Sequence, residues 1–488
     1  MLERFFPDIF GDIALFISGG SYMFRIKSIY TPKLSEAVGI IIAILLIMGF
    51  SIIKLEAAPH IPILISIMML FLFGLGKKVA YKELEMGMAE GAKAGLPAIY
   101  LFFFIGILIS SWMISGTIPT LIYSGFSIVT PKFFYALAFI VTSIVGVCIG
   151  SSLTTIATIG IAFLGISNAL GLSEAITAGA IVSGAFFGDK MSPLSDTTNL
   201  ASSIIKVDLF EHIRNMMWTT GPAFILSLLF FGVLSPDISE ADLSKINHYQ
   251  EGLLKTDLVH WYSIIPIVIL LIMTVAKKPA LLTLALSSVS AIVLSFIHHS
   301  AGGKELFNIL FNGYVSHTGI DAVDSLLSRG GIDSMMFTIS LVILALSMGG
   351  LLFTLGIIPV LLNRVEHLFT HSSRTIASAA LTAIGINILV GEQYLSILLT
   401  GETFQSSFQK VGLARKNLSR VLEDAGTVIN PLVPWSVCGV FISNVLGIST
   451  LSYLPFSIFC LLSPVLTILF GLTGKTLTFE DEEHKAVA

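Results

Sequence analysis

Long apolar runs, separated by short polar stretches, divide the chain along its whole length. In the first half they cover residues 38–53, 59–76, 96–114, 133–149, 172–187 and 219–234, and in the second half 260–276, 280–297, 334–352, 375–390, 418–441 and 453–472. A helix of about twenty apolar residues crosses the hydrocarbon core of a bilayer. The strands of a membrane β-barrel would instead alternate polar and apolar positions. The pattern predicts an all-α polytopic membrane protein in the cell membrane.

Polar stretches set the predicted domain boundaries. Residues 235–259 are rich in charge and predict a linker between two transmembrane units, 38–234 and 260–472. Residues 1–37 mix charged and aromatic positions and predict an N-terminal interfacial segment, without the regions of a signal peptide. Residues 473–488 end in "FEDEEHKAVA" and predict a solvated tail.

The two units resemble each other in sequence. "SGTIPTLIYSG" is similar to "LGIIPVLLNRV", "GSSLTTIAT" to "GEQYLSILL", and "GDKMSPL" to "GTVINPL". These matches pair Gly116 with Gly356, Gly150 with Gly391, and Gly188 with Gly426. Each pair is about 240 residues apart, and such a constant offset indicates an internal repeat.

Lysines indicate that the repeats are inverted. Lys77, Lys78 and Lys82 follow the second apolar run, whereas Lys277 and Lys278 follow the first run of the second unit. Basic residues favour the cytoplasmic side, so matching elements would enter the membrane from opposite sides. Two inverted-topology repeats, with broken helices or re-entrant hairpins at their interface, are typical of secondary transporters.

Composition narrows the function further. Only 12% of the 488 residues are charged, about half the share in a soluble domain. The net charge of −4 disfavours nucleic acid as a partner. The three cysteines lie far apart in apolar runs and predict neither a metal site nor a disulfide framework. Because no phosphate-binding loop or catalytic constellation is visible, we expect no ATP-driven step, no enzyme activity and no cofactor beyond transported ions.

The stretch "GSSLTTIATIG", residues 150–160, is the first polar interruption within an apolar region. Non-helical backbone at membrane depth needs protein or a water-filled cavity around it. We therefore interpret the hydroxyls of Ser151, Thr154 and Thr155 as part of an ion or substrate site. The alternative is that these side chains only bond between packed helices.

The second interruption is "GDKMSPLSDTTNLA", residues 188–201. Gly188 allows close backbone approach, Pro193 ends a helix, and a helix restarting after it offers N–H groups. A hard cation such as Na⁺ takes oxygen ligands, which this stretch supplies in abundance. We predict that Asp189 and Asp196 bind Na⁺, with further ligands from Ser192, Thr197 and Asn199. The alternative is a surface loop with a helix cap formed by Ser195 or Asp196.

Lys190 has two interpretations. It either forms an ion pair with Asp189 that breaks when a cation arrives, or extends to the membrane interface.

The second unit carries further candidates. Glu392 follows an apolar run, and we predict that it binds ions or protons. Arg420, Glu423 and Asp424 lie just before the matching break, which also contains Asn430, a further candidate ligand. Arg420 and Glu423 are three residues apart, so they either form a salt bridge that shields the carboxylate, or Glu423 and Asp424 carry protons.

Together with "KELEMGM…GLPAI" and "SWMISGTIPTLIYSG", these motifs make the chain resemble the NhaC-type Na⁺/H⁺ antiporter family over roughly residues 38–472. The resemblance implies exchange of cytoplasmic Na⁺ for external H⁺ by alternating access. It equally covers exchangers of small carboxylates, malate and lactate, coupled to Na⁺ and H⁺. A channel is a third class, disfavoured by the repeated breaks. We expect lipid, Na⁺ and H⁺ as partners, and a homodimer stays open.

Overall fold

The computed structural model describes residues 28–128, 133–235, 243–298, 302–320, 323–324, 327–366 and 371–480. The predicted interfacial segment before residue 28, part of the predicted linker (236–242) and the end of the tail (481–488) lie outside this description. Within it the chain is helical, and an isolated bridge between Leu413 and Phe479 is its one β feature. This confirms the all-α prediction.

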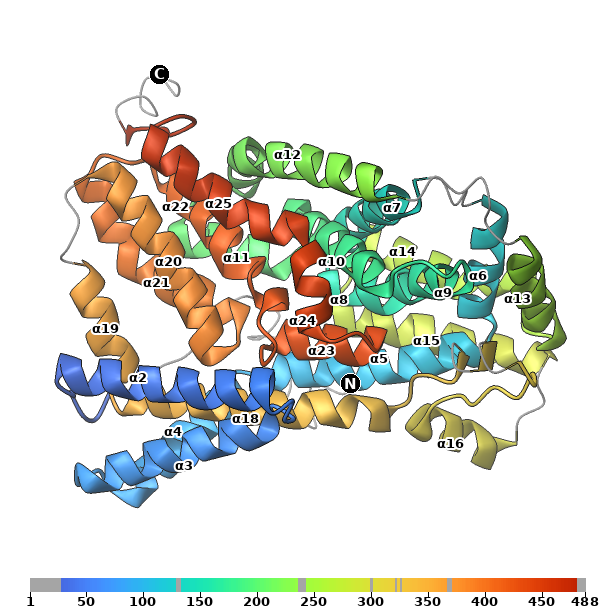
Figure 1. The fold of residues 1–488 in the computed structure, drawn as a ribbon, viewed down its shortest axis with the longest axis horizontal. Helices are drawn as coiled ribbons and strands as arrows, with labels where there is room; N and C mark the ends of the chain where they lie inside the picture. Colours follow the sequence, from blue (N-terminus) through green and yellow to red (C-terminus); the bar gives the residue numbers. More distant parts are fainter. Residues whose placement is uncertain are drawn as a thin grey trace, which may run out of the picture.

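The first half folds into helices that follow the predicted apolar runs (Figure 1). Their bounds are α2 Leu34–Gly49, η2 Phe50–Lys54, α3 His60–Gly76, α4 Tyr81–Lys93, α5 Leu96–Ile114, α6 Thr117–Ile128, α7 Phe134–Ile149, α8 Ser152–Thr155, η3 Ile156–Gly160, α9 Ile161–Ala169, α10 Glu174–Met191, α11 Asp196–Ile205 and α12 Leu209–Leu234.

The second half begins with a helix in the predicted linker, α13. The bounds are α13 Leu243–Lys255, η4 Trp261–Ile264, α14 Ile265–Val275, α15 Ala280–His298, α16 Gly303–Asn312, α18 Ile332–Thr354, α19 Ile357–Glu366, α20 Ser372–Val390, α21 Gln393–Lys410, α22 Arg415–Val421, η5 Leu422–Thr427, η6 Asn430–Leu432, α23 Val437–Leu446, α24 Thr450–Tyr453, η7 Leu454–Phe456 and α25 Ile458–Thr473.

Seven of the described helices are long and apolar enough to cross a membrane, or up to nine if each bent pair counts as one span. The bent pairs are Arg415–Leu432 with Val437–Leu446, at 45°, and Thr450–Phe456 with Ile458–Thr473, at 59°. The chain is therefore an integral membrane protein that crosses the bilayer several times.

Both halves turn at a glycine directly before a capped helix. Gly150 ends α7 with φ 68°, and the Ser151 side chain then caps α8. Gly391 ends α20 with φ 74°, and the Glu392 side chain caps α21. Positive φ is readily reached only by glycine, which explains these residues at both turns.

The helix breaks lie where the proline motifs predict them. Backbone around Ser192 and Pro193 separates α10 from α11, and residues 428–436 around Pro431 separate η5 from α23. Proline lacks the N–H that would continue the helix. In Figure 1 the short helices α8, α23 and α24 gather near the middle of the molecule, where α8 and α24 contact α10.

In both halves a side chain within the break donates a hydrogen bond to the helix before the glycine turn. Ser192 Oγ donates to the carbonyl of Val147 on α7 at 2.7 Å, and Asn430 Nδ2 donates to Asn387 Oδ1 on α20 at 2.8 Å. Ser192 and Asn430 correspond at the offset of the Gly188–Gly426 match, while Asn387 lies one residue before the position that corresponds to Val147. The inverted relation of the two halves and the domain boundaries stay predictions.

Candidate functional site

Asp189 joins the two polar interruptions of the first half. Its Oδ2 accepts hydrogen bonds from the backbone N–H of Ser152 at 3.1 Å and from Ser152 Oγ at 2.7 Å. Asp189 lies in the last turn of α10 and is 5% exposed, while Ser152 begins α8. A carboxylate at a helix N-terminus is favoured by the free N–H groups and by the helix dipole.

Asp196 opens the restarted helix α11, and its side chain is exposed. Ser195 is the residue that caps α11, accepting from the N–H of Thr198 at 3.4 Å. Asp196 is close enough to feel the negative charge of Asp189. The two predicted Na⁺ ligands therefore lie near each other, one buried and one facing an accessible space.

The predicted neutral ligands divide into two groups. Ser151 caps α8 by accepting from Thr154 N–H, and the Thr197 hydroxyl pairs with that of Ser195 at 3.0 Å. The others donate to backbone carbonyls and thereby brace the break. These are Thr155 to Ser151 at 2.8 Å, Ser192 to Val147 at 2.7 Å, and Asn199 to Pro193 at 3.0 Å and to Ser195 at 2.7 Å.

Glu392 brings the second half to the same region. Its Oε2 accepts from the N–H of Leu395 at 2.7 Å, and the side chain is 7% exposed. The neighbouring Tyr394 lies within electrostatic range of Glu392, Asp189 and Asp196. Carboxylates from both halves therefore surround Tyr394, which the sequence analysis missed although it lies within the "GEQY" interruption.

The described residues contain no group of three or more His, Cys, Asp or Glu side chains placed to hold a metal ion. The three acidic residues therefore do not form one common ligand set. Any Na⁺ bound here would take one or two carboxylates and complete its shell with hydroxyl and carbonyl oxygens.

Lys190 pairs with Asp424 of the second half, and both side chains are completely buried. Thr467 on α25 donates to the other Asp424 oxygen, and the ring of Phe459 lies 5.6 Å from Lys190 Nζ. Both interpretations of Lys190, the pair with Asp189 and extension to an interface, are wrong. Consecutive residues of a helix point in different directions, so Lys190 and Asp189 do not face each other.

The predicted salt bridge between Arg420 and Glu423 is also absent from the described residues. Arg420 Nη1 instead donates to the carbonyl and hydroxyl of Thr476, at 3.3 and 3.2 Å. Glu423 lies in the π-helical turn η5, which begins at Leu422. A π-turn changes the angular spacing that brings residues i and i+3 together in an α-helix.

Asn430 and His212 complete the buried polar contacts. Asn430 Oδ1 accepts from Cys438 N–H at 2.9 Å, so its amide braces the break on both sides. His212 on α12 is buried, hydrogen-bonded to Ser419 at 2.8 Å and close enough to Lys190 to feel its charge. No sequence motif marked His212 or Thr467, because each contacts a residue far away in the chain.

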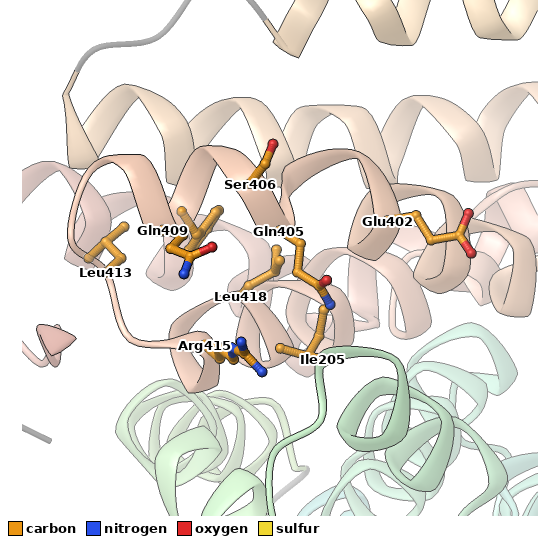
Figure 2. Close-up of a pocket in the computed structure, with 9 residues that line it drawn as sticks. Ile205, Glu402, Gln405, Ser406, Gln409, Leu413, Arg415 and Leu418 are labelled. Atoms are coloured by element: carbon orange, nitrogen blue, oxygen red, sulfur yellow. The ribbon is translucent and has the colours of Figure 1, made fainter. Parts of the chain in front are cut away.

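A surface pocket of about 240 Å³ lies between the ends of α11, α21 and α22 (Figure 2). Figure 2 shows Gln405 and Glu402 of α21 along one side and Arg415 of α22 on the other.

Comparison with known proteins assigns the family. The model of the Na⁺/H⁺ antiporter family matches residues 184–475, more than half of the chain. The chain belongs to the Na⁺/H⁺ antiporter family. It is 40% identical to the Na⁺/H⁺ antiporter NhaC of Alkalihalophilus pseudofirmus, over 89% of this chain and 94% of that protein.

Two further relatives are similar over most of their length. NhaC of Bacillus subtilis is 38% identical over 90% of this chain and 98% of that protein. The malate-2H⁺/Na⁺-lactate antiporter of B. subtilis is 32% identical over 93% of this chain and 97% of that protein. The family match confirms the resemblance that the sequence motifs indicate. Because the relatives are antiporters, the chain is a transporter and not an enzyme.

Proposed function

We propose that this chain is a secondary transporter of the cell membrane that exchanges Na⁺ for H⁺ by alternating access. The observation that carries the proposal is the position of Asp189, a buried carboxylate at the junction of two helix breaks in a member of the antiporter family. We expect no cofactor beside the two transported ions. A homodimer is also an expectation, which rests on the sequence analysis alone.

Na⁺ binds at Asp189 and Asp196 in this proposal. Asp189 is held by Ser152 and supplies charge from within the protein, while Asp196 meets the ion from the accessible side. The hydroxyls of Ser151, Thr154 and Thr197, which lie at the starts of α8 and α11, complete the shell. Protons and Na⁺ compete because a carboxylate that accepts a proton loses its charge for the cation.

A buried ion pair joins the two halves beside the site. Lys190 contacts Asp424, and this pair links α10 to η5 near the Asp189 carboxylate. Glu423 is buried without an ionic partner among the described residues, which makes it the proton carrier we propose. Glu392 brings a second exchangeable carboxylate from the opposite half.

Exchange of small carboxylates is the alternative, supported by the similarity to the malate-2H⁺/Na⁺-lactate antiporter. A carboxylate substrate would need a positive group to bind. Lys190 is engaged by Asp424, and Arg420 by Thr476, so each would first have to leave its partner. This argument favours the inorganic cation.

The test uses purified protein in liposomes that contain a pH-sensitive dye, challenged in turn with NaCl, KCl, lactate and malate. Saturable pH change with NaCl alone, absent without protein, supports Na⁺/H⁺ exchange and excludes a channel when it reverses with the ion gradients. A response that requires lactate or malate contradicts it and supports the carboxylate exchanger.

A further inference from the structure

One stripe of α21 carries buried polar atoms without a hydrogen-bond partner among the described residues. These atoms are Gln393 Oε1, Thr400 Oγ1 and Ser407 Oγ, on side chains that are 6%, 0% and 4% exposed. The three residues are spaced by seven positions, about two helical turns, and therefore lie on one face of the helix.

The helix packed against α21, α22 continued by η5, carries a second set of this kind. Arg420 Nε, both carboxylate oxygens of Glu423 and Thr427 Oγ1 are buried and lack a partner in the described chain. Thr427 lies beside Glu423, near enough to interact with its carboxylate, although the two side chains do not reach full hydrogen-bond geometry.

Close contacts at two glycines fix how these helices are aligned. A Cβ atom placed on Gly401 would lie 3.2 Å from Leu422 Cδ1, and one placed on Gly426 would lie 3.2 Å from Ile397 Cγ1. Residue numbers rise along α21 as they fall along its partner, so the two helices are antiparallel. Thr400 therefore lies at the level of Glu423, half-way along the seam between the helices.

Such a seam is costly as a purely structural contact. Leaving a buried polar atom without a partner is unfavourable, and more so for a charged group. Water inside proteins occurs where two to four polar groups can bind it. Polar groups aligned within a membrane protein mark the pathways of ions and protons.

One end of the seam lies beside Glu392 of the proposed site, and the other end lies at the surface pocket. At one end, Gln393 follows Glu392 directly. At the other, Gln405, Arg415 and Leu418 of the same two helices line the surface pocket of about 240 Å³ (Figure 2). From Gln393 to Ser407 the helix rises about 21 Å, a large part of the membrane thickness.

We propose that this seam is the hydrated route by which protons pass between the pocket and the Glu392 end of the site, with Glu423 as the relay half-way. The route deepens the proposed function and rests on it for the identity of the transported species. Thr400 and Ser407 are then route residues that hold water rather than ligands of Na⁺.

Cysteine labelling tests the route. In a Cys148→Ser background, which removes the exposed thiol, Thr400→Cys and Ser407→Cys are treated in membranes with a cationic methanethiosulfonate during turnover. The control is Leu395→Cys, on the opposite face of the same helix, where the native side chain is 2% exposed and belongs to the apolar core. All three side chains are buried, so we expect both route cysteines to react at least about tenfold faster than the control only because water in the route admits the reagent to them.

Equal, slow labelling of all three cysteines overturns the route. Labelling does not depend on which ion is carried, so this result is separable from failure of Na⁺/H⁺ exchange.

A second variant guards against misfolding of the cysteine proteins. Thr400→Val preserves shape and removes the unpartnered hydroxyl, so we expect unchanged or higher thermal stability, a several-fold lower turnover, and an unchanged apparent KM for Na⁺. Unchanged turnover in Thr400→Val contradicts the route.

Discussion

The Lys190 ammonium is hydrogen-bonded to the Asp424 carboxylate, 234 residues away in the sequence, and neither side chain is exposed. This ion pair connects α10, which carries Asp189, to η5, which carries Glu423. A buried pair is compensated only while both partners are present.

Removing one partner of this pair leaves a buried charge uncompensated. We expect Lys190→Met or Asp424→Asn to destabilise the protein by about 3–5 kcal/mol, and the double variant to recover much of that loss. The check is a double-mutant cycle by thermal unfolding in detergent.

The exposed pair of Lys93 with Glu90 is the matched control, with side chains 64% and 53% exposed. Lys93→Met should change stability little, because solvent screens surface pairs. A double variant of Lys190 and Asp424 that is no more stable than either single variant would refute the pairing.

At Gly188 the backbones of α10 and α7 approach each other closely. A Cβ atom there would lie 2.5 Å from Gly146 Cα, so we expect Gly188→Ala to cost about 1–3 kcal/mol by overpacking. In contrast, Gly232 on α12 has no described atom within 4 Å of such a Cβ, and Gly232→Ala should be neutral or stabilising. The check is thermal unfolding of both variants. Equal stabilities of Gly188→Ala and Gly232→Ala would contradict the close packing at Gly188.

The sequence predicts the local features of this fold well and its distant contacts poorly. Apolar runs and the turns at Gly150 and Gly391 depend on neighbouring residues, so pattern alone predicts them. The partner of Lys190 depends on how the two halves pack, which periodicity does not encode. The pairing of Arg420 with Glu423 was wrong because a π-turn has no clear sequence pattern.

Glu392 combines a helix cap with a negative charge. Glu392→Gln keeps an oxygen that can accept from Leu395 N–H but removes the charge, whereas Glu392→Ala removes both. We expect Glu392→Gln to fold normally with at least about tenfold lower exchange, and Glu392→Ala to lose about 1 kcal/mol in addition. Transport and unfolding are measured on both, and normal exchange in Glu392→Gln would show that its charge is not used.

Asp324 organises the loop before α18, outside the membrane-spanning segments. Its carboxylate accepts from Thr318 N–H at 2.7 Å, the hydroxyls of Thr318 and Ser316 at 2.8 Å, and Gly319 N–H at 3.0 Å. The Thr318 N–H is the largest cause that lowers the pKa of Asp324 to about 2. Because the pKa is lowered in the folded loop, the ionised carboxylate stabilises the loop at any pH above the usual pKa of a carboxyl group. This contribution is lost as the pH falls from about 4 to about 2.

Hydrogen exchange of the Thr318 and Gly319 amides measures that contribution. After correction for the intrinsic exchange rate, we expect protection down to about pH 4 and its loss toward pH 2. Asp324→Asn should lose protection already at neutral pH, with transport little changed. Full protection in this variant would mean that the carboxylate does not hold the loop.

The central claim is that Na⁺ and H⁺ compete for the carboxylate of Asp189. It is tested by adding NaCl to purified protein in weakly buffered detergent and measuring the protons released, for the native protein, Asp189→Asn and Asp208→Asn. Asp208 also caps a helix, but it is exposed at the start of α12 and serves as the control. The account predicts saturable proton release from the native protein and Asp208→Asn and its loss in Asp189→Asn. Undiminished release from Asp189→Asn would contradict it.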